Sequence, residues 1–240
     1  MTVLVDKKLS ERFEVAFNQI HSWLQKNVRN ARSDKFTDLL KIGFPSFSII
    51  RKYYHDLKMY GRLRNSIVHD KVELGFYIAE PHESVVDKIE KIAAQLTHPK
   101  AAVSIATKPV IYFHENTKLS EVLTAIQQHA YSVFPIYDTE GYKWLLTSEN
   151  IIQWFAKNMI GTSIQINEVE IKDLFPLGKS YLVEFAPKEA GMFEIEEYFE
   201  NYHLKGKKLE AVIITETGLK TQKPIGIVTS WDLVEIDVLD

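Results

Sequence analysis

One pattern, made of apolar runs and a helix-like stretch, occurs twice in the second half of the chain. This duplication limits the possible folds more than any other feature. The first copy has an apolar run, a helical stretch, a second apolar run, a turn and a third apolar run, at residues 109–113, 119–128, 133–137, 138–141 and 143–146. The second copy repeats this order at residues 181–185, 188–202, 211–214, 215–218 and 226–228. One copy is too small to bury its own sheet. The two copies are therefore expected to pack against each other and to form a cleft on their shared axis.

The first 95 residues have a helical pattern instead. Apolar residues that recur at spacings of three and four form one stripe, at Phe13, Phe17, Ile20 and Leu24. The pattern changes at His98-Pro99-Lys100. We therefore predict an α+β chain with a helical bundle at 1–98, followed by two β-α-β-β-α repeats, at 99–162 and 163–240, that pack as a pseudo-two-fold pair.

Charge is distributed unevenly along the chain, although the net charge is only −3. Residues 1–98 contain 16 basic and 12 acidic side chains, whereas the remainder contains 13 and 20. A basic N-terminal part could face a polyanion such as RNA. The alternative is an ordinary solvated helical surface.

Several classes of site are not expected. Cysteine is absent, which excludes disulfides, thiolate metal sites and cysteine nucleophiles and is typical of an intracellular protein. The histidines have no spacing typical of metal ligands, so no metal site is predicted. No signal-peptide segment and no run of about 18 apolar residues occurs. We expect a cytoplasmic protein without membrane contact.

A short polar motif follows the last apolar run of each copy. Thr147 precedes Asn150 by three residues, and Thr229 precedes Asp232 by the same spacing, with Ser230 between them. A threonine at a strand-to-helix junction can offer its hydroxyl, beside free backbone N–H groups, to a phosphate. One helical turn later, the carboxylate or amide can accept hydrogen bonds from the two hydroxyls of a ribose. The spacing is also typical of a helix cap, which is a purely structural alternative.

The surroundings of these motifs resemble the CBS domain, a family of paired repeats that sense adenine nucleotides. The first copy carries the resemblance in the strand from Ala130 to Pro135 and in the apolar pair that precedes Thr147. The second copy keeps the Thr229 motif, but Ala211-Val212 stands where the first copy has Phe134-Pro135. The resemblance covers roughly residues 100–240.

This resemblance implies a regulatory ligand, AMP, ADP, ATP or cyclic di-AMP, and no required cofactor. The predicted ligand-binding residues are Thr147, Asn150, Thr229, Ser230, Asp232, Tyr112, Tyr131, Ser132 and Val133. A carboxylate accepts hydrogen bonds from a vicinal diol more strongly than an amide does. We therefore expect a strong site at Asp232 and a weak or empty one at Asn150. Tyr131 and Tyr112 could equally be core aromatic residues.

A second resemblance lies in the helical part. Arg64, Asn65 and His69 resemble the signature of HEPN domains, helical bundles of which many members are metal-independent ribonucleases that act as dimers. The resemblance implies that His69 exchanges a proton with the RNA 2′-hydroxyl or the leaving oxygen while Arg64 neutralises the phosphate. Asn65 lies on the same helix face as His69. Other HEPN-like domains are inactive dimerisation or binding modules, so it stays open whether the chain is an enzyme.

Three functions are compatible with these features. The first is a regulatory protein in which the repeats bind an adenine nucleotide or cyclic dinucleotide and modulate the helical domain or a partner. The second is a nucleotide-regulated, metal-independent ribonuclease of the HEPN type. The third is a non-catalytic dimerisation scaffold. A homodimer is expected under all three, because both resemblances imply it, since CBS pairs and HEPN bundles commonly associate through flat apolar faces, and because C₂ is the commonest symmetry.

Overall fold

A computed structural model describes residues 8–29, 31–69, 77, 79–159, 163, 165–175 and 181–234, apart from the side chains of residues 68 and 69. The chain divides into two compact units, Met1–Lys100 and Ala101–Asp240. We call them the helical unit and the repeat unit. Each is described by itself.

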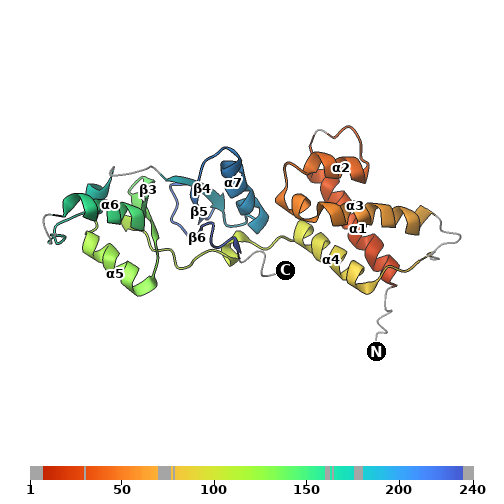
Figure 1. Ribbon diagram of the computed structural model, residues 1–240, viewed down its shortest axis with the longest axis horizontal. Coiled ribbons are helices and arrows are strands. Elements are labelled where there is room, and N and C mark those ends of the chain that lie inside the picture. Colours follow the sequence, from red (N-terminus) through yellow and green to blue (C-terminus); the bar gives the residue numbers. More distant parts are fainter. Residues whose placement is uncertain are drawn as a thin grey trace, which may run out of the picture. The chain divides into compact units, whose positions relative to one another are not determined.

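The described part of the helical unit consists of helices, drawn in red to yellow in Figure 1. They are α1 (Leu9–Asn27), α2 (Phe36–Gly43), α3 (Ser48–His69) and α4 (Glu83–Thr97). The predicted apolar stripe lies on α1, where Phe13, Phe17, Ile20 and Leu24 are all buried. It packs mainly against α4, which contributes Val86 and Ile89. Burial of these two facing stripes provides the hydrophobic stabilisation of the bundle.

The repeat unit contains two three-stranded sheets with the same topology. The first repeat consists of β1 (Phe113–His114), α5 (Leu119–His129), β2 (Val133–Asp138), β3 (Gly141–Thr147) and α6 (Ser148–Asn158). The second consists of β4 (Leu182–Pro187), α7 (Met192–Leu204), β5 (Leu209–Thr215) and β6 (Gly226–Val228). In each sheet the first two strands are parallel and the third is antiparallel to the second. The duplication predicted from the sequence is therefore present in the strand pairing.

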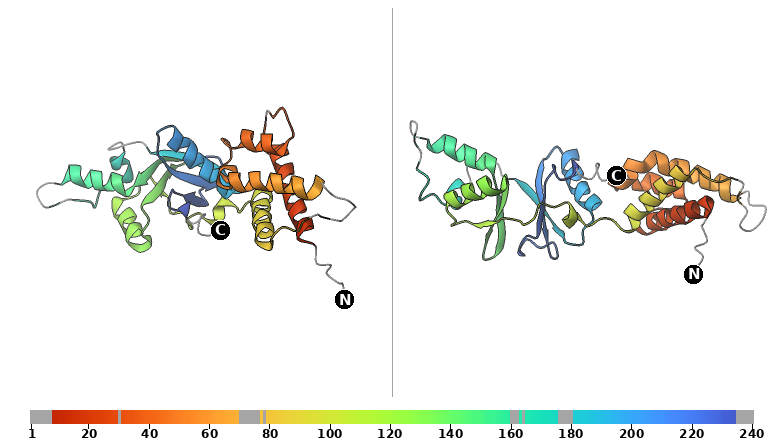
Figure 2. Two further views of the ribbon diagram at one scale, coloured as in Figure 1. Left: turned by 45° about the vertical axis from the view of Figure 1, so that its right-hand side comes forward. Right: turned by 90° about the horizontal axis from the view of Figure 1, so that it is seen from below.

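The two sheets lie between the helices of the repeat unit. Figures 1 and 2 show α5 and α6 on one side of the first sheet and α7 on the outer side of the second. The facing sides share one apolar cluster, in which Leu145 of the first sheet packs with Ala211, Ile213 and Ile227 of the second. Each sheet thus covers the face that its own helices leave open.

Each repeat is preceded by a short 3-10 helix that packs on the other repeat. The helix η1 (Ala102–Ser104) lies before the first repeat, yet the Ala102 N–H donates to the Ala190 carbonyl of the second at 2.8 Å. The helix η2 (Ile171–Leu174) lies before the second repeat, and the Ile171 N–H donates to the Thr117 carbonyl of the first at 3.0 Å. This reciprocal exchange supports the pseudo-two-fold relation, which stays a prediction.

Three details differ from the sequence-based expectations. The strand register places Val212 opposite Val228 and Phe134 opposite Leu146. The counterpart of Phe134-Pro135 is therefore Val212-Ile213, so the expected match with Ala211-Val212 is wrong by one residue. Strand β1 consists only of Phe113 and His114, so it shares one residue with the expected run 109–113, and Pro109 has no N–H to pair. Helix α7 begins four residues later than expected, because a turn from Pro187 to Ala190 precedes it.

Because η2 packs on the first repeat although it lies outside it, we predict that a residue of η2 stabilises the core of the first repeat. Ile171 is fully buried in the cluster between α5, α6 and the first sheet. Ile171→Ala should lower the free energy of unfolding by about 2–5 kcal/mol, the usual loss for a buried isoleucine. The measurement is urea unfolding followed by tryptophan fluorescence, because Trp154 belongs to this cluster. The matched control is Ile152→Ala on α6, where the side chain is 66% exposed and the change should stay within about 0.5 kcal/mol. Equal effects of the two substitutions would contradict the described packing.

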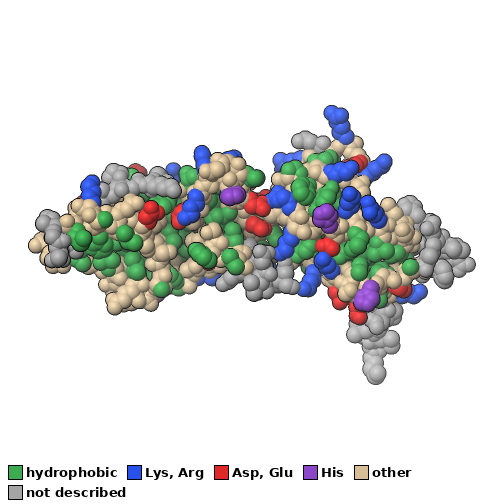
Figure 3. Space-filling model, viewed as in Figure 1, with side chains coloured by type: hydrophobic (Ala, Val, Ile, Leu, Met, Phe, Trp, Pro, Cys, Tyr) green, Lys and Arg blue, Asp and Glu red, His purple; other side chains and the backbone are tan. Residues whose placement is uncertain are grey.

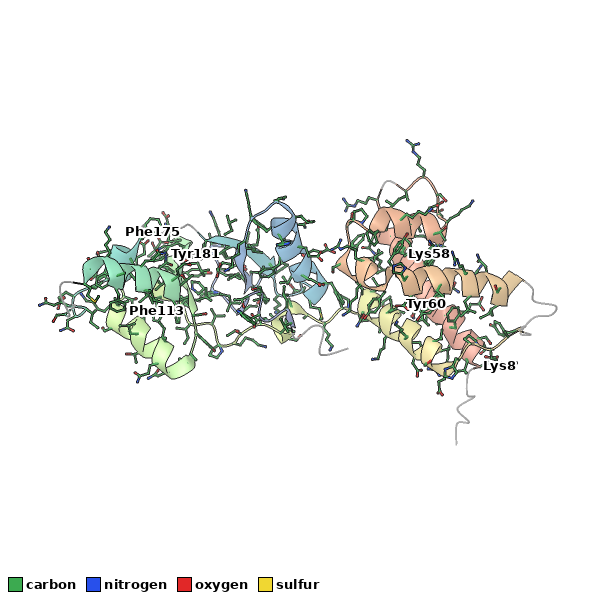
Figure 4. The ribbon with its side chains drawn as sticks, in the orientation of Figure 1. Lys8, Lys58, Tyr60, Phe113, Phe175 and Tyr181 are labelled. Atoms are coloured by element: carbon green, nitrogen blue, oxygen red, sulfur yellow. The ribbon has the colours of Figure 1, made fainter. Side chains whose placement is uncertain are left out.

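Tyr60 predicts an alkaline loss of stability in the helical unit. Its ring lies inside the bundle (Figure 4), edge-on to Phe13 at 5.9 Å between ring centroids. Burial, together with the nearby Asp56 carboxylate, raises the pKa of Tyr60 to about 12. An ordinary tyrosine in the unfolded chain has a pKa of about 10. The folded state therefore disfavours the phenolate form of Tyr60. The stability that the neutral side chain contributes is complete below about pH 10 and is lost as the pH rises from about 10 to about 12.

Tyr60→Phe should make the decline in unfolding free energy above pH 10 less steep. The measurement is urea unfolding of the wild type and the variant at a series of alkaline pH values. The same decline in both proteins would show that Tyr60 does not titrate in this range.

Candidate functional site

The first Thr-Ser motif joins β3 to α6 through a reciprocal helix cap. The Asn150 N–H donates to the Thr147 hydroxyl at 3.3 Å, and the Asn150 Oδ1 accepts from the Thr147 N–H at 3.0 Å. The Thr147 hydroxyl also donates to this Oδ1 at 3.0 Å. Both side chains are buried, with 6% and 4% exposed. The carbonyl oxygen of Asn150 is thus fully engaged in holding the junction.

The second motif repeats the side-chain contacts of the first, but the Asp232 N–H donates to the Thr229 carbonyl at 3.2 Å instead of to the hydroxyl, and residues 230–233 form a turn. The Asp232 Oδ2 accepts from the Thr229 N–H at 2.6 Å and from the Thr229 hydroxyl at 2.8 Å. The Asp232 Oδ1 accepts from the Thr107 hydroxyl at 3.4 Å, a long hydrogen bond. Asp232 is half-buried and Ser230 is exposed. One carboxylate oxygen holds the cap, and the other faces only this weak donor among the described residues.

In both motifs the side chain therefore makes the hydrogen bonds of a cap, which is the purely structural alternative to nucleotide binding. The cap does not by itself use all the hydrogen-bonding capacity of a carboxylate, which has about four acceptor positions. Asp232 can keep its cap and still accept further hydrogen bonds at Oδ1. Asn150 has no second oxygen, so the two motifs differ chemically although the spacing of their side-chain contacts is the same.

The structure brings three of the predicted residues of the first repeat together. Val133 is the register partner of Thr147, and the Ser132 carbonyl accepts from the Ser148 N–H at 2.9 Å. Ser132 is exposed beside this junction. The start of β2 and the start of α6 therefore form one edge of the first repeat.

The two predicted aromatic residues lie elsewhere in the first repeat. Tyr131 is half-buried, packs against the cluster between the helices and the sheet, and lies 5.5 Å from the His129 ring. Tyr112 contacts the ring of Tyr137 at 5.3 Å between centroids. These positions favour a packing role for both tyrosines, and their role in stacking on adenine stays a prediction.

Each motif is contacted by a residue that the sequence analysis did not single out. Tyr181, which precedes β4 of the second repeat, donates to the Glu149 carboxylate of the first motif at 2.7 Å (Figure 4). Burial raises the pKa of Tyr181 above its usual range. Thr107, which precedes the first repeat, contacts Asp232 of the second motif. Only the duplication in the sequence could have indicated these two residues, since Thr107 and Tyr181 each precede the first strand of a repeat.

An open cavity of about 580 Å³ adjoins the second motif. Ser230 lines it together with two neighbouring cations, Lys207 and Lys208, and with His203 at the end of α7. Lys208 also forms an ion pair with Glu210 at 2.9 Å. The cavity is also lined by the Glu200 carboxylate, so it offers a hydroxyl and charges of both signs two residues along the chain from Asp232, which does not itself line it.

The candidate residues of the helical unit lie on α3. Arg64 and Asn65 line a cavity between α1, α2 and α3. His69 is the last residue of α3, and its side chain lies outside the described part, so the predicted catalytic arrangement is not tested.

Within the described ranges, no group of three or more His, Cys, Asp or Glu side chains could hold a metal ion. No helix in this part of the chain is both long enough and apolar enough to cross a membrane.

Comparison with solved structures finds CBS proteins of low sequence identity. The CBS domain pair of protein MJ0100, in complex with 5′-methylthioadenosine and S-adenosyl-L-methionine, is 18% identical, and the match covers 58% of this chain and 97% of that one with a TM-score of 0.42. A CBS domain-containing protein from Kribbella flavida is 14% identical over 58% and 99% of the two chains, with a TM-score of 0.43. The acetoin utilization protein AcuB from Vibrio cholerae is 12% identical over 58% and 90%, with a TM-score of 0.41.

Comparison with curated protein sequences gives no match. A family model does match: that of the CBS domain, over residues 102–157, which include η1, the whole first sheet and the Thr147 motif. The chain therefore contains a CBS domain at residues 102–157.

Proposed function

We propose that the repeat unit is a regulatory module that binds an adenine nucleotide, AMP, ADP, ATP or cyclic di-AMP, chiefly at the second motif. The observation that carries this proposal is the half-buried Asp232 carboxylate, whose Oδ1 has, among the residues that the structure describes, only the 3.4 Å contact with Thr107. A vicinal diol offers two O–H donors to such a carboxylate, and charge-assisted hydrogen bonds are about twice as strong as neutral ones. The ribose of a nucleotide supplies this diol.

Phosphate binding would follow from the residues beside Asp232. Ser230 is exposed and lines the same cavity as Lys207 and Lys208. The Ser230 hydroxyl and the Lys207 ammonium would hold the phosphate and the Asp232 carboxylate the ribose, while the Glu200 carboxylate in the same lining lowers the net positive charge of the cavity. The adenine base is proposed from the CBS match of the first repeat and from the resemblance of the second to it.

The first motif is the weaker of the two sites in this proposal. A ribose could reach Asn150 only if its buried cap opened, because its single side-chain oxygen already accepts from Thr147. Loss of a helix cap costs about 1 kcal/mol. Ligand binding at the first motif would have to offset this loss.

Regulation is proposed to start at Thr107. Its hydroxyl competes with a ribose for Asp232, and its backbone pairs with Ile227 of β6, with N–H to carbonyl at 2.9 Å. Thr107 lies only a few residues after the boundary of the helical unit at Lys100. A ligand that displaces Thr107 would therefore loosen the segment through which the two units are connected along the chain, and so modulate the helical unit or a partner.

The other functions stay predictions. Cleavage of RNA at Arg64, Asn65 and His69, a homodimer, and a cytoplasmic location rest on the sequence features given above. The enzymatic and scaffold alternatives have no support from a specific contact in the described residues.

Asp232→Asn tests the proposal without removing the cap, because asparagine keeps an oxygen for Thr229. The loss of charge should raise the Kd for the best-bound nucleotide about tenfold, which corresponds to about 1.4 kcal/mol. The measurement is calorimetric titration with AMP, ADP, ATP, S-adenosylmethionine and cyclic di-AMP. The matched control is Asn150→Ala in the first motif, which should leave the main binding event in place. Absence of heat with every ligand, or an effect of Asn150→Ala as large as that of Asp232→Asn, would contradict the proposal.

Thr107→Val tests the competition. Valine has nearly the same shape but no hydroxyl, so the ligand no longer displaces a donor from Asp232. We expect the Kd to fall about two- to threefold, the lower end of the range for one hydrogen bond, because this one is long. Thr117→Val, in the loop before α5, is the control and should leave the Kd unchanged. An increase in Kd for Thr107→Val would show that Thr107 assists binding.

A further inference from the structure

A second cavity lies inside the helical unit, far in sequence from the repeats. It has a volume of about 390 Å³ and is bounded by α1, α2 and α3. Small-molecule sites usually occupy about 300–1,000 Å³. The cavity is therefore large enough for a small ligand.

The apolar wall of this cavity is formed by two buried aromatic rings. Phe17 of α1 and Phe36 of α2 lie 4.4 Å apart between centroids. Gly61 of α3 makes this arrangement possible, because a Cβ at this position would lie 3.1 Å from the Phe36 ring. A glycine inside a helix costs about 1 kcal/mol relative to alanine. The contact explains why glycine is nevertheless found here.

The main evidence for a ligand in this cavity comes from the Arg64 side chain. Its Nε is buried and has no hydrogen-bond partner among the described residues, and its guanidinium lies 5.9 Å from the centre of the Phe17 ring. A buried donor of a charged group without an acceptor costs more than the 1–3 kcal/mol of a neutral one. Buried polar atoms in native proteins usually have a partner, so an unsatisfied one indicates an ion or water that binds there.

The remaining polar lining of the cavity consists mainly of donors. Lys35 precedes α2, no side chain caps this helix, and Thr37 lies in its first turn beside the cavity. Asn65 follows Arg64 on α3, and the His21 ring bonds the Asp34 carbonyl through Nε2 at 2.8 Å. No carboxylate is among the described lining residues. Figure 3 shows Lys and Arg side chains gathered over the helical unit, which agrees with its positive charge balance.

We propose that this cavity binds the phosphate group of a small soluble molecule. A phosphate carries close to two negative charges at neutral pH and accepts on several oxygens, which matches Arg64, Lys35 and the free N–H groups of the first turn of α2. The planar fork of arginine suits such an anion particularly well. The cavity is partly open, since Lys35, Thr37 and Asn65 are exposed, but its volume of about 390 Å³ suits a small molecule better than an RNA strand, whose binding surfaces need a groove that follows the backbone. The proposal is independent of nucleotide binding at the repeats.

The test follows the Arg64 Nε–H and the Thr37 backbone N–H signals in a nitrogen–proton NMR spectrum of the full chain during titration with inorganic phosphate, and the Thr37 signal gives the Kd of the Arg64 variants. At about 150 mM sodium chloride, where exposed charges are screened within about 8 Å, both signals should still shift and saturate. Arg64→Gln should raise the Kd for phosphate about tenfold or more, and Lys35→Ala by about threefold. Arg62→Gln is the matched control, because Arg62 is an exposed arginine on the same helix that does not line the cavity. It should leave the Kd unchanged.

Further measurements distinguish a phosphate ester from free phosphate as the ligand and add a conservative variant of Arg64. Tighter binding of ribose 5-phosphate than of free phosphate would identify a phosphate ester as the ligand, and the reverse would identify the free anion; both support the proposal. Arg64→Lys keeps the charge without the fork and should give an intermediate Kd if the helical unit stays folded. A signal that does not saturate, an equal effect of Arg62→Gln, or tighter binding of an RNA oligonucleotide than of either small probe would overturn it.

Discussion

The apolar contact between the two sheets is the interaction on which the repeat unit depends. Each three-stranded sheet is covered by helices on one side only, and Leu145 of one sheet packs with Ala211 and Ile213 of the other on the open side. A single small sheet with one bare apolar face is not stable in water. The duplication in the sequence is therefore a physical requirement of this architecture. The exchange of η1 and η2 adds hydrogen bonds between the repeats that a simple face-to-face contact lacks.

The same arrangement brings the candidate site together from distant parts of the chain. Thr107 and Asp232 are 125 residues apart in sequence and meet because the segment before the first repeat pairs with β6. In both motifs the side chain three residues on accepts from the threonine N–H and hydroxyl, yet the Asp232 carboxylate has a second oxygen beyond this contact and the Asn150 amide does not. Gly141 lies where the two repeats pack closely, because a Cβ there would lie 2.7 Å from the Lys220 carbonyl oxygen.

Much of this structure was predictable from periodicity. The stripe from Phe13 to Leu24 has a helical period and is buried on α1, and the duplicated strand order agrees with the observed pairing. Register was less accessible, since Ala211 and Val212 both fit a buried strand and only hydrogen bonding to β6 decides between them. The burial of Asn150 and the contacts of Thr107 and Tyr181 depend on tertiary packing. No local pattern predicts such contacts. The cavity beside Arg64 likewise results from three helices that meet, so the sequence could indicate Arg64 and Asn65 but not His21, Lys35 or Thr37.

A crystal structure of the full chain, grown with the tightest-binding adenine nucleotide, would show directly whether the second motif holds the nucleotide by its ribose. We expect density with both ribose hydroxyls within hydrogen-bonding distance of Asp232, the phosphate near Ser230 and Lys207, and the Thr107 hydroxyl displaced from the carboxylate. Density for the nucleotide elsewhere, with the Thr107 contact to Asp232 intact, would contradict this expectation.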